Sequence, residues 1–533
     1  MRALFRRKLY DPIFLLALSA GLLAFVVQSG ELGSADTQHR LNSTHALWTS
    51  APPVFPAEYP EFGVHGRDGK LQSWYGIGQS LLMLPADLVG TAIQRLPAFR
   101  GYEDDPSVRN IVVSYSTNIL LTVLTALLTL RFLRQFGFTL RQAIAGVFAL
   151  LVSTTHLHYT QNMMENNYIF LLTLAGFSYG YEWVRTQSRR ALLLGSGALG
   201  LNLLTRITTG MDLLAGVMFV LLVLWFEGCR GRSFGARLRG YFAVAVPVFA
   251  FFGLLDRLYQ FYRFGSFFNT YVHVAAQEMR QRDPSLAAKY PFETPFHVGF
   301  LGALFTPEKS IFLFDPLLIV AILVAVLPWK RFTPEIRAFY VAAFLMLLAY
   351  LSFYARYTVW SGDFAWGDRY VSTAVEFFAL LAIPLLLRYR QRLGRFVFGT
   401  GLGLLAASTV IQIASLAFWM PLEIYQMDSF GHPTFVIGLR MKNIVAFALG
   451  KMNAWGLVTP DMTYDSWDYV HITTWNFLPF LLQRVGAAPP WVVDVAFAVW
   501  GMALMALVLV GWRLWRLLTQ HDVIPVEPDP VVA

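Results

Sequence analysis

Long apolar runs recur along this chain, and each is close to the length that a helix needs to cross a bilayer. A hydrocarbon core of roughly 30 Å takes about 20 helical residues, and such runs lie between residues 12 and 512. Hydrophobic residues make up 56% of the 533 residues and charged residues only 14%, which leaves little polar surface. A transmembrane barrel would instead show alternating segments of about 10 residues. The sequence therefore predicts an all-α polytopic membrane protein.

Short clusters of Lys and Arg stand between the apolar runs, and they predict the topology because positively charged loops stay in the cytoplasm. The clusters share one side of the membrane only if residues 76–97 do not cross it. Asp87, Gln94 and Arg95 suit that segment to an interfacial helix that lies on or dips into the outer face. About twelve transmembrane helices then remain, and both termini are cytoplasmic. The net charge of +9 belongs to these scattered clusters and is not a nucleic-acid signal.

This topology divides the chain into four parts. They are a transmembrane catalytic module at 1–420 with its outer loop 29–109, an outer region at 421–490, a last transmembrane helix at 491–515, and a Pro-rich, disordered cytoplasmic tail at 516–533. The cytoplasmic loops are short and carry no P-loop and no dinucleotide-binding glycine motif. We therefore expect chemistry on the outer face, with a substrate that the membrane supplies and no cofactor. The single cysteine, Cys229, excludes intrachain disulfides and multi-cysteine metal sites.

Two carboxylates on the outer side are the candidate catalytic residues. Asp36 lies about one turn beyond the first apolar helix, in the most polar loop of the chain. A carboxylate there could deprotonate an acceptor hydroxyl or amine, although it could also be a solvated loop residue or a helix cap. Glu165 is the only carboxylate in a short outer loop, where it could orient an acceptor or cap a helix.

Lys and Arg are enriched on the cytoplasmic side of membrane proteins, so each one on the outer side calls for an explanation. Arg206, Lys309 and Arg369 are candidates for binding the phosphate of a donor, since guanidinium and ammonium groups bind phosphate oxygens. The alternative is an ion pair, for which Arg369 has Asp363 and Asp368 nearby in sequence.

Polar and aromatic side chains in the same loops are candidates for binding the rest of the substrate: His39, Arg40, Tyr75 and Trp366. Aromatic residues are also common at bilayer interfaces without any ligand. A metal site is not expected, because the spacing of the outer His and Asp residues matches no standard ligand pattern.

Several stretches together resemble a known family, and their order along the chain is more specific than any one of them. They are SADTQHRL, GRDGKLQSWYGIGQSLLMLP, TQNMMEN, LLTRITTG, LFTPEKSIFLFDP and WSGDFAWGDRY. With an acidic residue just after the first helix and a long outer loop, the chain resembles the GT-C superfamily of membrane glycosyltransferases. It is most similar to the bacterial branch related to protein O-mannosyltransferases and the lipid A aminoarabinose transferase.

The resemblance implies transfer of a monosaccharide from a polyprenyl-phosphate carrier to a lipid, glycan or protein acceptor of the cell envelope. The site would face the periplasm, and the protein would lie in a bacterial inner membrane. Asp36 would be the general base, Glu165 a second acid, and Arg206, Lys309 and Arg369 the carrier-phosphate ligands. The protein mannosyltransferases carry an Asp-Glu pair where this chain has Asp36 and Thr37, which weakens the protein-acceptor reading.

Two other interpretations of the sequence remain open. A transporter or flippase for a lipid-linked glycan would carry ionisable residues in mid-span and discontinuous helices. A ligase or polymerase that joins preassembled lipid-linked glycans would share the outer site. Neither reading involves a nucleic acid.

Overall fold

The computed structural model describes residues 11–59, 62–99, 106–419, 422–458, 474–485 and 488–520. Within them the chain is helical apart from loops and one two-stranded antiparallel sheet, in which β1 (Gly63–His65) pairs with β2 (Leu71–Ser73). The prediction of an all-α polytopic membrane protein is confirmed.

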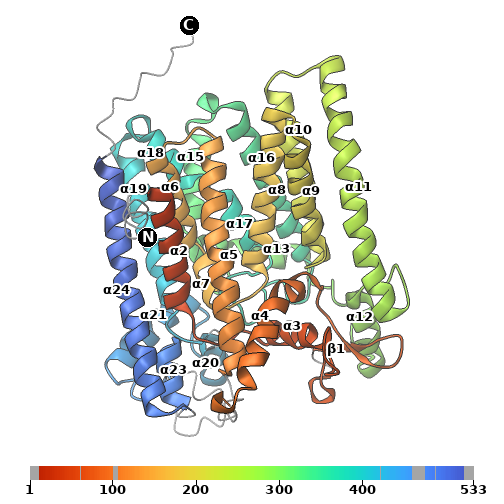
Figure 1. Cartoon of the computed structure of the whole chain (residues 1–533), viewed down its shortest axis with the longest axis vertical. Coiled ribbons are helices and arrows are strands. Elements are labelled where there is room, and N and C mark those ends of the chain that lie inside the picture. Colours follow the sequence, from red (N-terminus) through yellow and green to blue (C-terminus); the bar gives the residue numbers. More distant parts are fainter. Residues whose placement is uncertain are drawn as a thin grey trace.

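A bundle of roughly parallel and antiparallel helices forms the body of the molecule (Figure 1). Its members are α2 (Pro12–Val27), α5 (Val108–Gln135), α6 (Leu140–Ser153), α8 (Asn166–Thr186), α9 (Arg189–Leu203), α10 (Gly210–Phe226), α11 (Gly231–Phe264), α13 (Phe296–Phe305), α14 (Ile311–Phe314), α15 (Leu317–Val326), α16 (Pro334–Tyr354), α17 (Ser372–Ala379), α18 (Ala382–Arg388), α19 (Arg390–Ser415) and α24 (Pro490–Gln520).

Shorter elements gather at one end of this bundle, the lower end in Figure 1. They include the sheet and the helices α3 (Ala35–Ala46), α4 (Gly78–Gln94), α7 (His156–Gln161), α12 (Tyr271–Arg282), α20 (Leu422–Phe430), α21 (Val436–Ala448) and α23 (Leu478–Val485).

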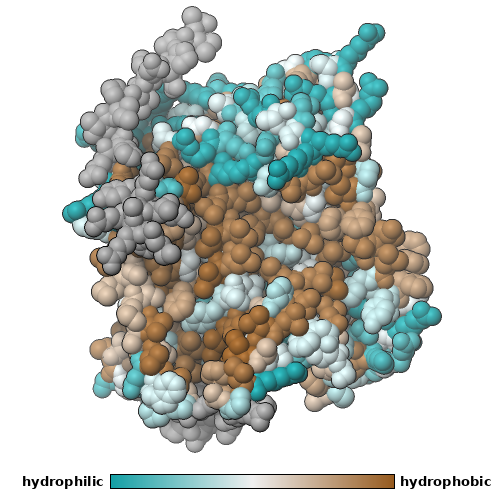
Figure 2. Space-filling view, in the orientation of Figure 1, coloured by the Kyte–Doolittle hydropathy of each residue, from teal (hydrophilic) through white to brown (hydrophobic). Residues whose placement is uncertain are grey.

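The bundle has the surface of a membrane protein. Six helices among the described residues are long and apolar enough to cross a membrane: α5, α10, α11, α16, α19 and α24. Four shorter apolar helices accompany them. Figure 2 shows a broad hydrophobic band around the middle of the molecule and hydrophilic surface at both ends. The count of about twelve spans, and which end faces the cytoplasm, stay predictions.

Helix α4 covers most of the segment 76–97, which we expected to be interfacial. It does not appear among the span candidates found in the described part of the chain. It packs against α3 and against α5. Asp87 is buried on this helix and accepts hydrogen bonds from Arg109 Nε on α5 at 2.5 Å, Trp48 Nε1 at 2.8 Å and His45 Nδ1 at 3.1 Å. One carboxylate thus holds the segment between α2 and α5 onto the bundle.

Packed aromatic rings fill the centre of the bundle. Phe177 on α8 stacks on Phe219 of α10 with 5.0 Å between ring centroids, and Phe339 of α16 packs against Phe132 of α5. Helices α11 and α24 at the periphery differ: only 11% of the residues in the most apolar stretch of α11 are buried, and none of those in the most apolar stretch of α24. Their apolar surface is therefore available to lipid.

The C-terminal part departs from the predicted boundaries in one respect. Helix α24 continues to Gln520, so the first residues of the predicted tail 516–533 are helical, and residues 521–533 lie outside the described residues. The predicted outer region 421–490 contains three helices, with residues 459–473 outside the described part. Its α20 and α21 are joined by a buried ion pair in which Arg440 Nε donates to Glu423 Oε1 at 2.6 Å.

Candidate active site

Asp36 lies in the first turn of α3, a helix that begins after the N-cap Ser34. Its Oδ1 accepts a hydrogen bond from the Tyr75 hydroxyl at 2.7 Å, and its Oδ2 accepts one from Arg369 Nη1 at 2.5 Å. Burial alone would raise the pKa of Asp36. The guanidinium groups of Arg369 and Arg40, together with the Tyr75 hydroxyl, instead hold this pKa at about 2. Asp36 is therefore a carboxylate at neutral pH.

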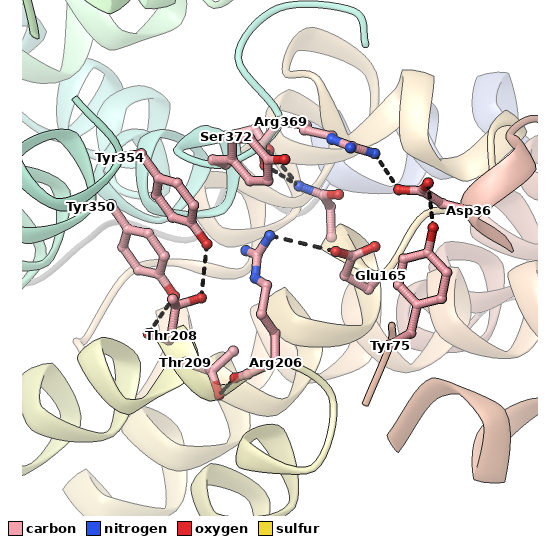
Figure 3. Close-up of polar contacts among 12 residues, drawn as sticks. Asp36, Tyr75, Glu165, Arg206, Thr208, Thr209, Tyr350, Tyr354, Arg369 and Ser372 are labelled. Carbon is pink, nitrogen blue, oxygen red and sulfur yellow. Dashed lines mark hydrogen bonds and ion pairs between the residues drawn. The ribbon is translucent and has the colours of Figure 1, made fainter. Parts of the chain in front are cut away.

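Glu165 stands at the N-terminus of α8, close to Asp36 (Figure 3). Its carboxylate pairs with Arg40 Nη2 at 2.8 Å and with Arg206 Nη1 at 3.5 Å. Burial opposes ionisation, but the charges of Arg40, Arg206 and Arg369 lower the pKa of Glu165 overall. The guanidinium of Arg40 also lies 4.2 Å from the centroid of the Tyr75 ring, so Arg40 contacts both Glu165 and the tyrosine that donates to Asp36.

We call Asp36, Arg40, Glu165, Arg206 and Arg369 the arginine cluster. It holds three guanidinium groups and two carboxylates, so its formal charge is positive. Several of its buried N–H groups have no hydrogen-bond partner among the described residues: Arg40 Nη1, Arg206 Nε and Nη2, and Arg369 Nε. Unpaired buried donors on cations are costly. Oxygens of an anionic ligand such as a phosphate would satisfy them.

Two glycines bring Tyr75 to the cluster. A Cβ on Gly76 would lie 2.3 Å from the carbonyl oxygen of Leu204, and one on Gly78 would lie 2.2 Å from Thr205 Oγ1. The backbone N–H of Gly78 donates to the Leu204 carbonyl at 2.8 Å. The Gly-x-Gly sequence after Tyr75 is therefore needed for the close approach of this loop to the segment that carries Arg206.

An aromatic wall that the sequence did not predict borders the cluster. Tyr354 and Tyr370 stack with 4.3 Å between ring centroids and 5° between their planes. The Arg206 guanidinium lies 5.9 Å and 5.8 Å from these two rings. Burial raises the pKa of Tyr271, at the start of α12, and Tyr354 and Tyr370 raise it further. The only sequence signal was that Tyr370 directly follows Arg369.

Lys309 lies outside the arginine cluster. Its buried ammonium donates to the backbone carbonyls of Asp363 at 2.6 Å, Ala365 at 2.8 Å and Gly367 at 3.5 Å. Burial lowers the pKa of Lys309 to about 8. The three donors of the ammonium are thus directed at the loop that leads to Arg369. Its predicted role as a phosphate ligand stays a prediction, and the contacts point to positioning of that loop.

Two of the predicted substrate-binding residues pack against protein. His39 stacks on Phe62 with 4.0 Å between ring centroids. Trp366 is 2% exposed and packs between Phe314 and His158. Tyr75 and Arg40, the other two, belong to the site. The described residues include no group of three or more His, Cys, Asp or Glu side chains placed to hold a metal ion.

The fold and the site together define a polytopic membrane protein with a positively charged polar site at one end of its helix bundle. Comparison with protein-family models and with curated proteins gave no match. Two solved structures are similar in fold. The crystal structure of ArnT from Cupriavidus metallidurans bound to undecaprenyl phosphate is 14% identical, with a TM-score of 0.43, over 94% of this chain and 76% of its own.

The crystal structure of the Archaeoglobus fulgidus oligosaccharyltransferase in the apo form is 13% identical, with a TM-score of 0.43, over 87% of this chain and 63% of its own. This chain thus spans less than two thirds of that protein. This chain is similar to both structures over most of its own length, and the resemblance to the GT-C superfamily remains what the sequence motifs imply. No residue's role is taken from either structure.

Proposed function

We propose that this protein is a membrane glycosyltransferase that takes a sugar from a polyprenyl-phosphate carrier and passes it to a cell-envelope acceptor. One observation carries the proposal. The unpaired N–H groups of Arg40, Arg206 and Arg369 surround two ionised carboxylates at an end of an apolar bundle. A phosphate joined to a lipid would satisfy the donors while its chain lay along the bundle.

The reaction needs a base on one side of the anomeric carbon and phosphate ligands on the other. The acceptor oxygen or nitrogen attacks that carbon, the carbon–oxygen bond to the phosphate breaks, and the acceptor proton passes to Asp36. Arg206 and Arg369 stabilise the leaving phosphate, which departs as polyprenyl phosphate. Glu165 holds Arg40 and Arg206 in place and can orient the acceptor. Attack opposite the leaving group inverts the anomeric centre.

The ion pair between Asp36 and Arg369 lets donor binding control the basicity of Asp36. A carboxylate with a pKa of about 2 is a weak base. Once a donor phosphate takes hydrogen bonds from Arg369, the pair weakens and the pKa of Asp36 rises toward the useful range. Asp36 would thus become a stronger base only while a donor, which carries the leaving group, is bound.

A transfer assay in proteoliposomes tests the proposal. Purified protein is given labelled polyprenyl-phosphate sugars and acceptor-rich membranes from a deletion strain, and wild type is compared with Asp36→Asn. The proposal expects transfer by wild type and its loss in a folded variant. Equal turnover by both proteins would remove Asp36 as the base and make Glu165 the next candidate.

A second function, translocation of a lipid-linked glycan, is favoured by one specific observation. Asp315 and Glu376 are buried and do not belong to the arginine cluster, and a carboxyl oxygen of each lies within hydrogen-bond distance of the Thr155 hydroxyl, at 3.1 Å and 2.9 Å. His156 Nδ1 lies 3.3 Å from the other oxygen of Glu376. Buried ionisable groups beside interrupted helices are typical of transporters. A fluorescent lipid-linked glycan that crosses proteoliposomes without sugar transfer would favour this function.

A further inference from the structure

A cavity of about 990 Å³ opens on the bundle far from the arginine cluster. It lies between the end of α15, the short helix η4 (Trp329–Arg331), the first turns of α16 and the start of α19. These elements belong to the upper end of the bundle in Figure 1, whereas α3 and α4 occupy the lower end. A cavity of this size can hold a large part of a lipid.

The cavity has apolar walls and a cationic mouth. Val341, Phe344 and Leu345 of α16 form one wall. Lys330, Arg331 and Arg392 also line the cavity and all three are exposed, and its lining includes no Asp or Glu among the residues that the structure describes. Their charged groups form no ion pair or hydrogen bond with the rest of the described chain, so they are available to an anionic ligand.

The backbone builds this arrangement. Gly394 interrupts the helical backbone of α19 with a φ of +76°, between Arg392 and Val397, both of which line the cavity. On the other side, Arg337 Nη2 donates to the carbonyl of Lys330 at 2.7 Å. The main chain at Lys330 is therefore tied to α16, while the three cationic side chains are exposed.

A buried hydroxyl supplies a second, independent observation. Tyr340 lines the cavity and is 2% exposed, and its hydroxyl has no hydrogen-bond partner among the described residues. The ring is fixed by stacking on Phe332 and by an edge contact with Phe378. An unpaired buried hydroxyl is costly, and a ligand oxygen inside the cavity would pair with it.

We propose that this cavity is a binding site for an anionic phospholipid of the membrane. Lys330, Arg331 and Arg392 bind the headgroup phosphate, and the apolar walls take an acyl chain. Tyr340 lies six residues into α16 from Pro334, which is about 9 Å along the helix axis. Its hydroxyl donates to an ester carbonyl of the lipid, deeper than the phosphate. The site does not depend on the proposed sugar transfer, because its ligand and its place differ.

Lipid binding to the purified full-length protein tests the proposal. Native mass spectrometry measures retention of phosphatidylglycerol and of phosphatidylcholine with the same acyl chains. We expect wild type to retain phosphatidylglycerol in preference. Arg331→Gln with Arg392→Gln should weaken that binding by about 25-fold, at about fivefold for each cation removed. Tyr340→Phe should weaken the binding of both lipids equally, because it removes only the hydroxyl and leaves the three cations in place.

The matched control is Arg232→Gln with Arg239→Gln, which removes the same charge from exposed positions of α11 that do not line the cavity. This control should bind phosphatidylglycerol as wild type does. Equal weakening in the control and in the cavity variant would overturn the proposal in favour of diffuse attraction. Equal retention of both lipids by wild type would also overturn it, as would displacement of phosphatidylglycerol by a polyprenyl phosphate at equal concentration.

Discussion

Arg369 Nη1 lies 2.5 Å from Asp36 Oδ2, and this ion pair joins two residues that are 333 positions apart in the chain. Both side chains are largely buried, at 15% and 18% exposure. The pair fixes the loop after α2 to the segment that precedes α17. Any ligand that binds Arg369 therefore acts on Asp36 directly.

Asp36→Asn should abolish most of the proposed sugar transfer, because the amide cannot accept the acceptor proton. We expect kcat to fall by roughly 10²–10⁴-fold. The measurement is initial rate in proteoliposomes, with melting temperature as the check on folding. Asp68→Asn is the matched control, since Asp68 is an exposed carboxylate of the same loop. Loss of activity in both variants would contradict a special role for Asp36.

Arg369→Gln should move the acid limb of the pH–rate profile to higher pH. The pKa of Asp36 is lowered from 3.8 to about 2, so its ionised form contributes stability that is present above about pH 4 and is lost as the pH falls through about 2. Without Arg369, burial raises this pKa, and Asp36 becomes protonated at less acidic pH. The profile of kcat/KM for wild type and variant checks the shift. An unchanged acid limb would mean that Arg369 does not control Asp36.

Lys309→Met should lower stability, because it leaves three buried backbone carbonyls without their donor. The expected cost is about 1–3 kcal/mol for each carbonyl that finds no other partner. If Lys309 instead bound the donor phosphate, its replacement would raise KM for the donor and leave the melting temperature unchanged. Thermal unfolding and donor kinetics on one preparation separate these outcomes.

Asp87→Ala should loosen the segment between α2 and α5, because it leaves Arg109 without its buried partner. Breaking such a pair costs about 3–5 kcal/mol. Glu182→Ala is the control, because the ion pair of Glu182 with Arg131 is 32% exposed on each side and should be worth at most about 1 kcal/mol. Thermal unfolding in one detergent measures both. Similar losses would show that Asp87 does not anchor the loop.

The membrane fold and the members of the cluster could be read from the sequence, since both rest on local signals. Apolar length predicts helices, and polar residues at the ends of apolar runs are few enough to single out Asp36, Glu165, Arg206 and Arg369. The polar and charged residues of the segment 76–97 predict an interfacial helix. In the structure its helix α4 lies with α3 at one end of the bundle.

The directions in which side chains point could not be predicted from the sequence. Lys309 is turned toward backbone carbonyls of the segment 363–367, and that segment folds back only in three dimensions. Trp366 is buried against Phe314 for the same reason. The stacked pair of Tyr354 and Tyr370 joins α16 to the loop before α17, and no local pattern relates these two residues.

The contact between α2 and α24 has a consequence for biosynthesis. Trp500 Nε1 donates to the carbonyl of Val26 at 2.8 Å, across 474 positions of sequence. Helix α2 leads directly into the loop that carries Asp36. During synthesis, the face of α2 that α24 covers stays exposed to lipid until the ribosome has added those residues. The loop that carries Asp36 therefore acquires its final support only when nearly the whole chain has been made, although its own residues are among the first to be synthesised.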